Sequence, residues 1–491
     1  MSDEEKNVNE SLDEENKEEV NEVIEEDLPG QTKATSVEDT VFEEAPKKKK
    51  KARKQRTPEE KKKKRIRDII ISCSVIFAVA LFFAICAIAG YGGSKTNNKM
   101  IDKIETVGCE LTPEIDEETG YYTFTTDRDF KVLQLTDVHI GAGAFSIKKD
   151  SWAINAVAKL VQTVKPDLVI VTGDVGYPVP FQAGTFNNLR AAETFAHLME
   201  QLGVYYAFVY GNHDTEAYSL YDRKEISEKV YLQEQYKHCL FQMGPNDVDG
   251  YGNYIINVKN SLGLITESFV MLDSHSYTNG DILGIAWEYD NIHPNQVEWY
   301  ENEIKSLNTK NIAKYNSLSE SEKDALATII GEDKTATALR FSNPDSMTVK
   351  SSLYFHIPLE EYKDAWYEYA DAGEDDSGLN NLTFNFGVAG ENKKIVYCGV
   401  GTDELFEKAQ ALKSTTNVFC GHDHLNNFSI TYYGKEGNKT TDHGITLTYG
   451  MSIDYLAYTG IYKKVEQRGG TIITVATNGA ITITQKKLID C

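Results

Sequence analysis

Apolar and polar positions alternate along the middle of the chain in a pattern typical of successive strands and helices. Short apolar runs rich in β-branched and aromatic residues occupy residues 130–140, 166–175 and 204–214. Between them, residues 152–164 and 186–202 carry apolar side chains at helical spacing. This order predicts a layered α/β domain, and each strand ends in polar residues, where open α/β sheets place their sites.

The second half of the chain continues mostly with strand-like runs. Apolar runs predict strands at residues 254–258, 268–272, 351–357, 416–420 and 445–450, a helix near 296–307, and a closing hairpin at 470–485. Asn478-Gly479 supplies the turn of that hairpin. Residues 310–350 form a polar mixture without an apolar repeat, so we interpret them as an insertion.

The longest apolar run, residues 69–89, contains no charged side chain. At about 1.5 Å per residue, it is long enough to cross a bilayer as one helix. Lys and Arg concentrate on its N-terminal side, which keeps that side in the cytoplasm. We therefore expect a single-pass signal-anchor helix over residues 68–90. A cleaved signal peptide is the alternative, because Ala87-Ile88-Ala89 resembles a cleavage site, but the preceding tail is very long.

Charge divides the segment before this run in two. Residues 1–46 carry 17 acidic and 3 basic side chains, a composition that cannot bury a core. Residues 47–67 are strongly basic and, in isolation, resemble a nuclear-import or nucleic-acid patch. Beside the apolar run, they are better explained as its cytoplasmic flank. We expect residues 1–67 to be a disordered cytoplasmic tail and residues 91–129 to be a polar linker, followed by a domain over residues 130–488.

Composition argues against two classes of protein. Of the 7 cysteines, Cys73 and Cys86 lie in the apolar run, and the others follow no pattern, so a disulfide framework is not expected. From Asp68 onward the chain has 56 acidic and 34 basic side chains, an excess that would repel nucleic acid. Nothing in the sequence indicates an oligomeric state.

Side chains with metal-ligand chemistry follow five of the predicted strands. In chain order they are Asp137-Val138-His139, Gly173-Asp174, Gly211-Asn212-His213-Asp214, His356, and Gly421-His422-Asp423-His424. Carboxyl ends of strands meet at one edge of a sheet, so these groups should converge. His422 and His424, two residues apart in an extended segment, would project from one face. Oxygen and imidazole ligands without thiolate favour two divalent ions such as Mn²⁺, Fe or Zn²⁺.

In this order, the motifs D-x-H, G-D, G-N-H-D, a single His and G-H-x-H resemble the calcineurin-like metallophosphoesterase superfamily. The resemblance covers residues 130–487. The run Phe355-His356-Ile357-Pro358, and Asn426 shortly after the last motif, are most similar to a purple-acid-phosphatase-like branch. The resemblance implies an α/β fold, a four-layer αββα sandwich, here preceded by one transmembrane helix and a disordered tail.

The resemblance also implies a role for each motif residue. One ion would be held by Asp137, His139, Asp174 and His424. The second ion would be held by Asp174, Asn212, His356 and His422. Asp174 would bridge the two ions, because a carboxylate has two oxygens. His213 would be the catalytic residue beside the ions, placed to bind the phosphate or to protonate the leaving oxygen.

The sequence departs from the family pattern at Tyr177. Many members have an acid at this position, which orients the histidine of G-N-H. Purple acid phosphatases have a ligating tyrosine there but normally lack the histidine of the first motif, whereas this chain has both His139 and Tyr177. We expect His139 to be the ligand and Tyr177 to line the pocket or support the ligands. The orientation of His213 stays open, because Asp214 need not reach it, and Asp423 is expected to be a supporting residue.

The resemblance therefore implies a metal-dependent phosphoesterase that cleaves phosphomonoester or phosphodiester bonds by attack of a metal-bridged hydroxide. The enzyme would be anchored in a membrane with its catalytic domain outside the cytoplasm, and its acidic surface favours small phosphoester substrates. The alternative is a non-catalytic scaffold or receptor of the same fold. Loss of metal ligands would mark that alternative, and none is missing here.

Overall fold

The computed structural model describes residues 57–278, 288–343 and 346–491. Its first element is the long helix α2 (Pro58–Ile101), which opens with a capping box between Thr57 and Glu60. Within the described ranges, α2 is the one helix long and apolar enough to cross a membrane. Most of the expected disordered tail, residues 1–56, lies outside the described residues. Residues 58–67 are helical rather than disordered, because their Glu, Lys and Arg side chains favour helix.

Helix α2 ends eleven residues beyond the expected limit of the membrane segment at residue 90. Its last turns are fixed by contacts with the following domain. The Ser94 hydroxyl donates to the Ala142 carbonyl at 3.4 Å, and the Asn97 side chain donates to the Ile147 carbonyl at 3.3 Å. These contacts lie within the compact unit Ile71–Cys491, which also contains both sheets of the protein.

The structure differs from the expectation of a linker over residues 91–129. After the end of α2, this segment forms strands β1 (Glu114–Ile115) and β2 (Tyr122–Thr125). Strand β2 runs parallel to β6 (Tyr254–Lys259), and Phe124 on β2 is fully buried, with its ring 5.0 Å from that of Phe130. The apolar side chains of this short strand therefore bring it into the sheet.

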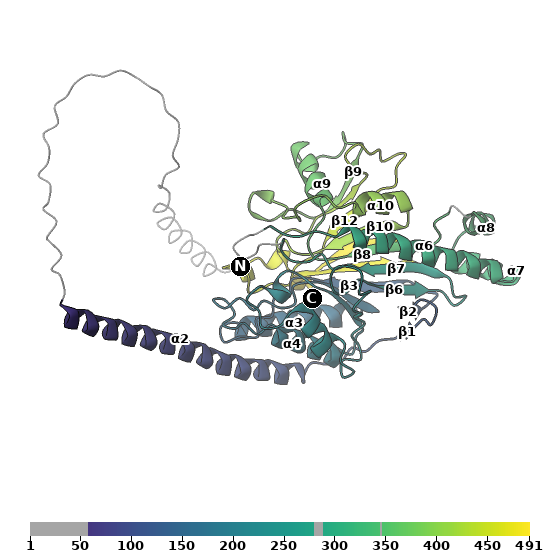
Figure 1. Ribbon diagram of the computed structural model, residues 1–491. Helices are drawn as coiled ribbons and strands as arrows, with labels where there is room; N and C mark the ends of the chain where they lie inside the picture. Colours follow the sequence, from purple (N-terminus) through teal and green to yellow (C-terminus); the bar gives the residue numbers. More distant parts are fainter. Residues whose placement is uncertain (1–56, 279–287, 344–345) are drawn as a thin grey trace, which may run out of the picture. The chain divides into compact units, whose positions relative to one another are not determined.

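Two sheets form the centre of the protein (Figure 1). The smaller has the order β14-β13-β3-β4-β5. Its strands are β3 (Phe130–Leu135), β4 (Leu168–Thr172), β5 (Tyr206–Val209), β13 (Gly469–Val475) and β14 (Ile481–Lys487). The larger has the order β1-β2-β6-β7-β8-β10-β12-β11-β9. Its remaining strands are β7 (Ile265–Met271), β8 (Lys350–Tyr354), β9 (Leu382–Phe386), β10 (Thr415–Cys420), β11 (Ser429–Tyr432) and β12 (Ile445–Tyr449).

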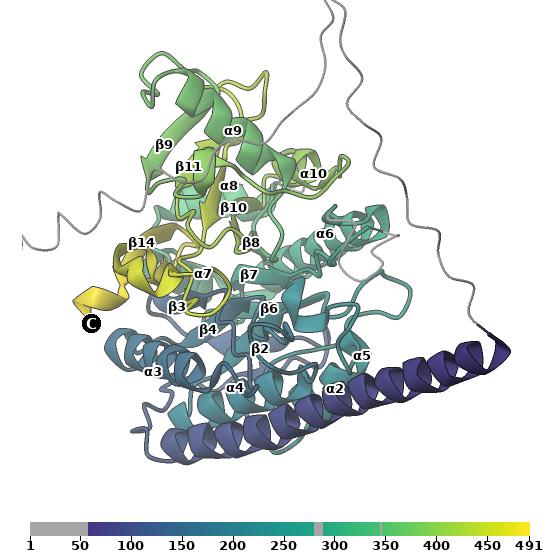
Figure 2. The ribbon, with the colours of Figure 1, turned by 90° about the vertical axis from the view of Figure 1, so that its left-hand side faces the viewer.

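Helices cover the outer faces of both sheets. Figure 2 shows α3 (Ile147–Val164) and α4 (Leu189–Leu202) beside the smaller sheet, and α9 (Glu360–Asp371) and α10 (Leu405–Leu412) beside the larger one. The short α5 (Arg223–Ile226) follows β5, and α6 (Pro294–Ser317) packs near β7. Large side chains fill the space between the sheets; the rings of Phe130 and Phe269, for example, lie 5.9 Å apart. This arrangement confirms the predicted α/β sandwich.

The segment expected to be an insertion, residues 310–350, is mainly helical. It contains the end of α6, then α7 (Glu320–Ile329) and α8 (Lys334–Ser342). A small apolar cluster holds these helices, and the rings of Tyr315 and Phe341 stack in it at 4.7 Å. The segment therefore has a core of its own beside the main one.

Candidate metal centre

The motif residues lie where five strands end, at one edge of the paired sheets. Asp137 and His139 follow β3, Asp174 follows β4, Asn212 and His213 follow β5, His356 follows β8, and His422 and His424 follow β10. Four of these residues, Asp137, His139, Asp174 and His422, have φ between 51° and 79°. Such left-handed backbone costs about 1–3 kcal/mol per non-glycine residue and is typical of functional sites.

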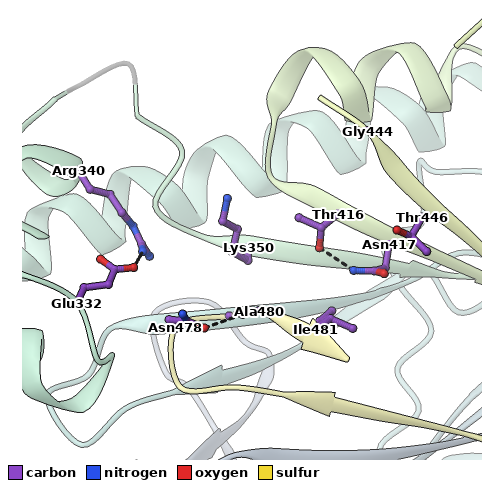
Figure 3. Close-up of a pocket in the computed structure, with 11 residues that line it drawn as sticks. Glu332, Arg340, Lys350, Thr416, Asn417, Gly444, Thr446, Asn478, Ala480 and Ile481 are labelled. Atoms are coloured by element: carbon purple, nitrogen blue, oxygen red, sulfur yellow. Dashed lines mark hydrogen bonds and ion pairs between the residues drawn. The ribbon is translucent and has the colours of Figure 1, made fainter. Parts of the chain in front are cut away.

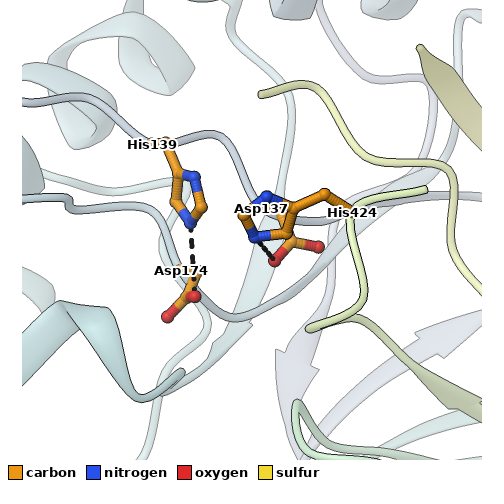
Figure 4. A group of neighbouring side chains, drawn as sticks. All are labelled: Asp137, His139, Asp174 and His424. Atoms are coloured by element: carbon orange, nitrogen blue, oxygen red, sulfur yellow. Dashed lines mark hydrogen bonds and ion pairs between the residues drawn. The ribbon is translucent and has the colours of Figure 1, made fainter. Parts of the chain in front are cut away.

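Four of the side chains form one buried group (Figure 4). Ligand atoms of Asp137, His139, Asp174 and His424 all lie within 4.8 Å of one another. The His139 Nε2 atom is 3.2 Å from Asp174 Oδ2, and His424 Nε2 is 3.5 Å from Asp137 Oδ1. This is the set that sequence reasoning assigned to the first ion.

A second group adjoins the first through Asp174. His356 Nε2 lies 3.2 Å from Asp174 Oδ2 and 3.1 Å from Asn212 Oδ1. His422 Nδ1 lies 3.0 Å from the same Asn212 oxygen. The structure thus brings all seven predicted ligands together, with Asp174 Oδ2 between His139 and His356.

The chemistry of this group fits divalent metal ions. Asp137 Oδ1 is buried without a hydrogen-bond partner in the described residues, which is costly for a carboxylate oxygen unless a cation binds it. Burial lowers the pKa of His422, helped by nearby His356, so its imidazole is neutral and can act as a ligand. Burial opposes ionisation of Asp174, but the imidazoles of His356 and His213 hold its pKa well below the ordinary value.

Asp454 supports the two histidines of the first group and was not found by sequence reasoning. It is fully buried after β12, with Oδ1 3.2 Å from His139 Nδ1 and Oδ2 3.0 Å from His424 Nδ1. These are ion-pair distances, although the angles depart from those of a good hydrogen bond. Backbone N–H groups of Leu456 and Ala457 donate to Oδ1 and fix the carboxylate. Both imidazoles are thereby turned so that Nε2 faces the carboxylates of Asp174 and Asp137.

His213 stands beside the ligands rather than among them. Its side chain is 22% exposed, and its backbone N–H donates to Asp174 Oδ1 at 2.8 Å. His213 Nδ1 lies 2.5 Å from Glu216 Oε1, and the Tyr277 hydroxyl donates to the same oxygen at 3.3 Å. Glu216 was also missed, although it lies only three residues after His213.

The acid next to His213 in the sequence has a different role. Asp214 accepts backbone N–H groups of Asp174, Gly176 and Gly211 at 2.8–3.0 Å and ties the second and third motif loops together. Burial, with the nearby Asp174, raises the pKa of Asp214 to about 6. It therefore shapes the loops and leaves the orientation of His213 to Glu216.

Tyr177 and Asp423 lie among the ligands without the geometry of a ligand. The Tyr177 ring lies 4.7 Å from the rings of both His139 and His213, and burial raises the pKa of its phenol. Asp423 accepts from the Tyr449 hydroxyl at 2.6 Å and from Asn426 at 3.0 Å. These contacts hold the loop that carries His422 and His424.

A separate polar cavity of about 380 Å³ lies at the other end of the same strands (Figure 3). Lys350 and Thr416, at the starts of β8 and β10, line it together with Arg340, which pairs with Glu332 at 2.9 Å. His356 and His422 follow the opposite ends of β8 and β10. The cavity is therefore distinct from the metal-ligand group.

Comparison with known proteins finds similarity to phosphoesterases and phosphatases. A family model described as calcineurin-like phosphoesterase matches residues 130–331. The chain is 25% identical over 356 residues to "Probable inactive purple acid phosphatase 14" of Arabidopsis thaliana, covering 68% of this chain and 73% of that protein. It is 26% identical over 348 residues to "Phosphatase DCR2" of Saccharomyces cerevisiae, covering 66% of this chain and 48% of that one. Among solved structures, a dimetal phosphatase from Danio rerio aligns with a TM-score of 0.41 and 10% identity, over 73% of this chain and 96% of that chain.

Proposed function

The chain belongs to the calcineurin-like phosphoesterase superfamily, and we propose on that premise that it is a membrane-anchored, dinuclear-metal-dependent phosphohydrolase. The observation that carries the proposal is the meeting of seven ligand side chains, Asp174 among them, while the buried Asp137 Oδ1 atom has no hydrogen-bond partner in the described residues. Carboxylate, amide oxygen and imidazole suit Mn²⁺, Fe or Zn²⁺.

Asp137, His139, Asp174 and His424 would hold one ion, and Asp174, Asn212, His356 and His422 the other. Two such ions would supply Lewis acidity and a water of lowered pKa for hydrolysis of a phosphoester. The protein holds the ligands in place through the backbone contacts of Asp214 and the two-sided contact of Asp454.

His213 would bind a phosphoryl oxygen or donate a proton to the leaving oxygen. Its Nδ1 atom is engaged by Glu216, which leaves Nε2 as the atom available to substrate. The partly exposed imidazole lies at the edge of the ligand group, where a small ester can reach it. Glu216 fixes the ring and stabilises its protonated form.

Small phosphomonoesters or phosphodiesters are the proposed substrates. The excess of acidic side chains supports small substrates over polyanions such as nucleic acid. The apolar part of α2 supports a membrane anchor, and the Lys and Arg side chains before it support a cytoplasmic N-terminus with the catalytic domain on the other side.

A second candidate function is a non-catalytic scaffold or receptor with the same fold. The name of the Arabidopsis relative, which includes the words "probable inactive", favours this candidate. The complete ligand set and the His213–Glu216 pair favour the enzyme.

Hydrolysis of an aryl phosphate with Mn²⁺, with and without a chelator, separates the two candidates. We expect turnover that the chelator removes and that added Mn²⁺ restores. Asp174→Asn or His422→Ala should abolish hydrolysis and lower the bound metal, whereas His213→Ala should retain metal but lose turnover. Full activity of Asp174→Asn would contradict the proposal, and metal binding without hydrolysis of any aryl mono- or diester would favour the scaffold.

A further inference from the structure

Two exposed phenylalanines project from the loops that carry the metal ligands. Phe145 is 50% exposed and comes six residues after His139, whereas Phe181 is 90% exposed and comes seven residues after Asp174. The two loops are joined, because the Phe145 N–H donates to the Ala183 carbonyl at 3.0 Å. We call the exposed side chains of Phe145 and Phe181 the apolar tip.

The loop that carries Phe145 has a fixed shape. Asp150 is buried and accepts the N–H groups of Gly141 and Ala142 at 2.8 and 3.0 Å, and the Ser146 hydroxyl at 2.8 Å. These hydrogen bonds therefore hold the loop in a shape that leaves Phe145 exposed.

The apolar tip lies beside the apolar segment of α2. The rings of Phe82 and Phe145 are 6.3 Å apart, and those of Phe83 and Phe186 are 5.4 Å apart. A side chain at Gly90 would come within 3.2 Å of the backbone of Gly143 and Ala144. Glycine at this position lets the helix lie directly against the loop.

These contacts set the depth of the tip. Phe82 precedes Ala89, the end of the apolar run, by seven residues, which is about 10 Å along a helix. If residues 69–89 occupy the hydrocarbon layer, a side chain packed on Phe82 lies inside that layer as well. The tip then meets lipid rather than water, which accounts for an exposed Phe181 on a polar protein.

Two pairs of a basic and an aromatic side chain involve α2 and the helices that follow the loops of the tip, α3 and α4. The Arg190 guanidinium lies 5.9 Å from the centre of the Tyr91 ring, one helical turn or less beyond the apolar run, and Lys148 lies 5.1 Å from the Trp152 ring. Arg, Lys, Tyr and Trp are the side chains that membrane proteins place at the level of the lipid headgroups. Their grouping here is notable in a chain with a net charge of −24.

We infer that the apolar tip, Phe145 and Phe181, inserts into the bilayer next to α2 and presents the metal centre to phosphoesters carried by membrane lipids. The inference rests on the proposed function for its substrate and on the proposed anchor for its depth. The lipid surface is favoured over a second protein as the occupant because Phe145 of the tip packs against Phe82 in the apolar segment of α2.

The insertion is tested on full-length protein reconstituted in vesicles, without any assay of activity. Phe181→Trp and Phe145→Trp each add a fluorophore at the tip, and Leu339→Trp adds one at a position on α8 that is 70% exposed. The fluorescence that each variant adds to that of the native tryptophans is then measured with lipids brominated in the acyl chain. We expect these lipids to quench the added fluorescence of the two tip variants. The added fluorescence of Leu339→Trp should persist. Equal quenching of Phe181→Trp and Leu339→Trp would overturn insertion. If the tip variants escape quenching only at high protein density in the vesicles, the tip contacts a second copy of the protein instead of lipid.

The substrate class is tested with the double variant Phe145→Ser/Phe181→Ser and the matched control Leu339→Ser. In vesicles of phosphatidylcholine doped with phosphatidic acid, we expect the double variant to lose at least tenfold in release of phosphate or phosphocholine, with aryl phosphate hydrolysis kept. An equal loss on both substrates, or wild-type protein that hydrolyses aryl phosphate but neither lipid, would overturn the lipid assignment. Wild-type protein that hydrolyses none of them contradicts the proposed function, while the quenching experiment still decides insertion.

Discussion

Glu216 lies directly behind His213, with its Oε1 atom 2.5 Å from the imidazole Nδ1 atom. Glu216 is buried and its Oε1 atom also accepts the Tyr277 hydroxyl, so the carboxylate is held on two sides. The acid that holds the imidazole of His213 thus comes from the G-N-H-D loop itself.

The Glu216 contact predicts a defect in proton donation for Glu216→Gln. The variant removes the negative charge that stabilises the protonated imidazole of His213. Turnover should therefore fall about 10²-fold for aryl phosphates with poor leaving groups and little for those with good ones. Rates across a series of phenols of different pKa measure this dependence. Bound metal should stay unchanged.

The matched control for this prediction is Glu200→Gln. Glu200 makes an analogous contact with His238 at 2.9 Å, away from the metal ligands, so its loss should leave the leaving-group dependence as in the wild type. A uniform loss of rate for all phenols in Glu216→Gln would show that Glu216 acts on something other than the proton of His213.

Asp454 predicts a selective weakening of the first ion. Because one carboxylate contacts Nδ1 of both His139 and His424, Asp454→Asn should lower the affinity of that ion by about 10- to 100-fold while the second ion stays bound. Titration with a chelator, followed by metal analysis, gives the two affinities. Two ions held as tightly as in the wild type would contradict the role given to Asp454.

The motif residues could be predicted from the sequence because each follows its own strand, and strand ends of neighbouring strands meet. Asp454 could not, because its partner His139 is 315 residues earlier, and a parallel bridge between Thr136 and Ser452, from different sheets, brings their loops together. Glu216 lies only three residues after its partner His213, but no motif spacing in the sequence pointed to it. A polar residue after the predicted strand 445–450 was the available signal for Asp454.

The end of α2 shows a different limit of sequence reasoning. The polar composition after residue 90 predicted a linker there. In the structure the helix continues, because a side chain at Gly93 would clash with Ile147 and glycine alone allows α2 to pack there. Tertiary contact, which the local pattern does not contain, decides the boundary.

The position of Tyr177 predicts a colourless iron-loaded protein. The ring packs between His139 and His213, and burial together with nearby Asp454 raises the pKa of the phenol, so it stays protonated. A phenolate bound to Fe(III) would give a visible charge-transfer band. We expect identical visible spectra for the wild type and Tyr177→Phe; a band that only the wild type shows would make Tyr177 a ligand.

Glu267 predicts a pH-dependent component of stability that is independent of the metal centre. It is fully buried on β7, where Ser352 donates a hydrogen bond to Oε1 at 2.8 Å, and Oε2 has no partner in the described part of the chain. Burial raises the pKa of Glu267 to about 8, far above the value of about 4.3 in an unfolded chain. Between these two pH values the folded protein binds the proton and the unfolded protein does not, so stability falls as the pH rises through this window.

Glu267→Gln removes this component, because glutamine keeps the shape of a protonated glutamic acid without titrating. The variant should melt at a temperature close to that of the wild type near pH 5 and at a clearly higher temperature near pH 8, since each pKa unit corresponds to about 1.4 kcal/mol. Melting of the metal-free protein across this range measures the difference. Glu228→Gln, at a carboxylate that is 56% exposed, is the control and should follow the wild type at every pH. If the melting temperatures of Glu267→Gln and the wild type changed in parallel with pH, Glu267 would be ionised in the folded protein. Lys350, its neighbour on β8, would then supply the compensating charge.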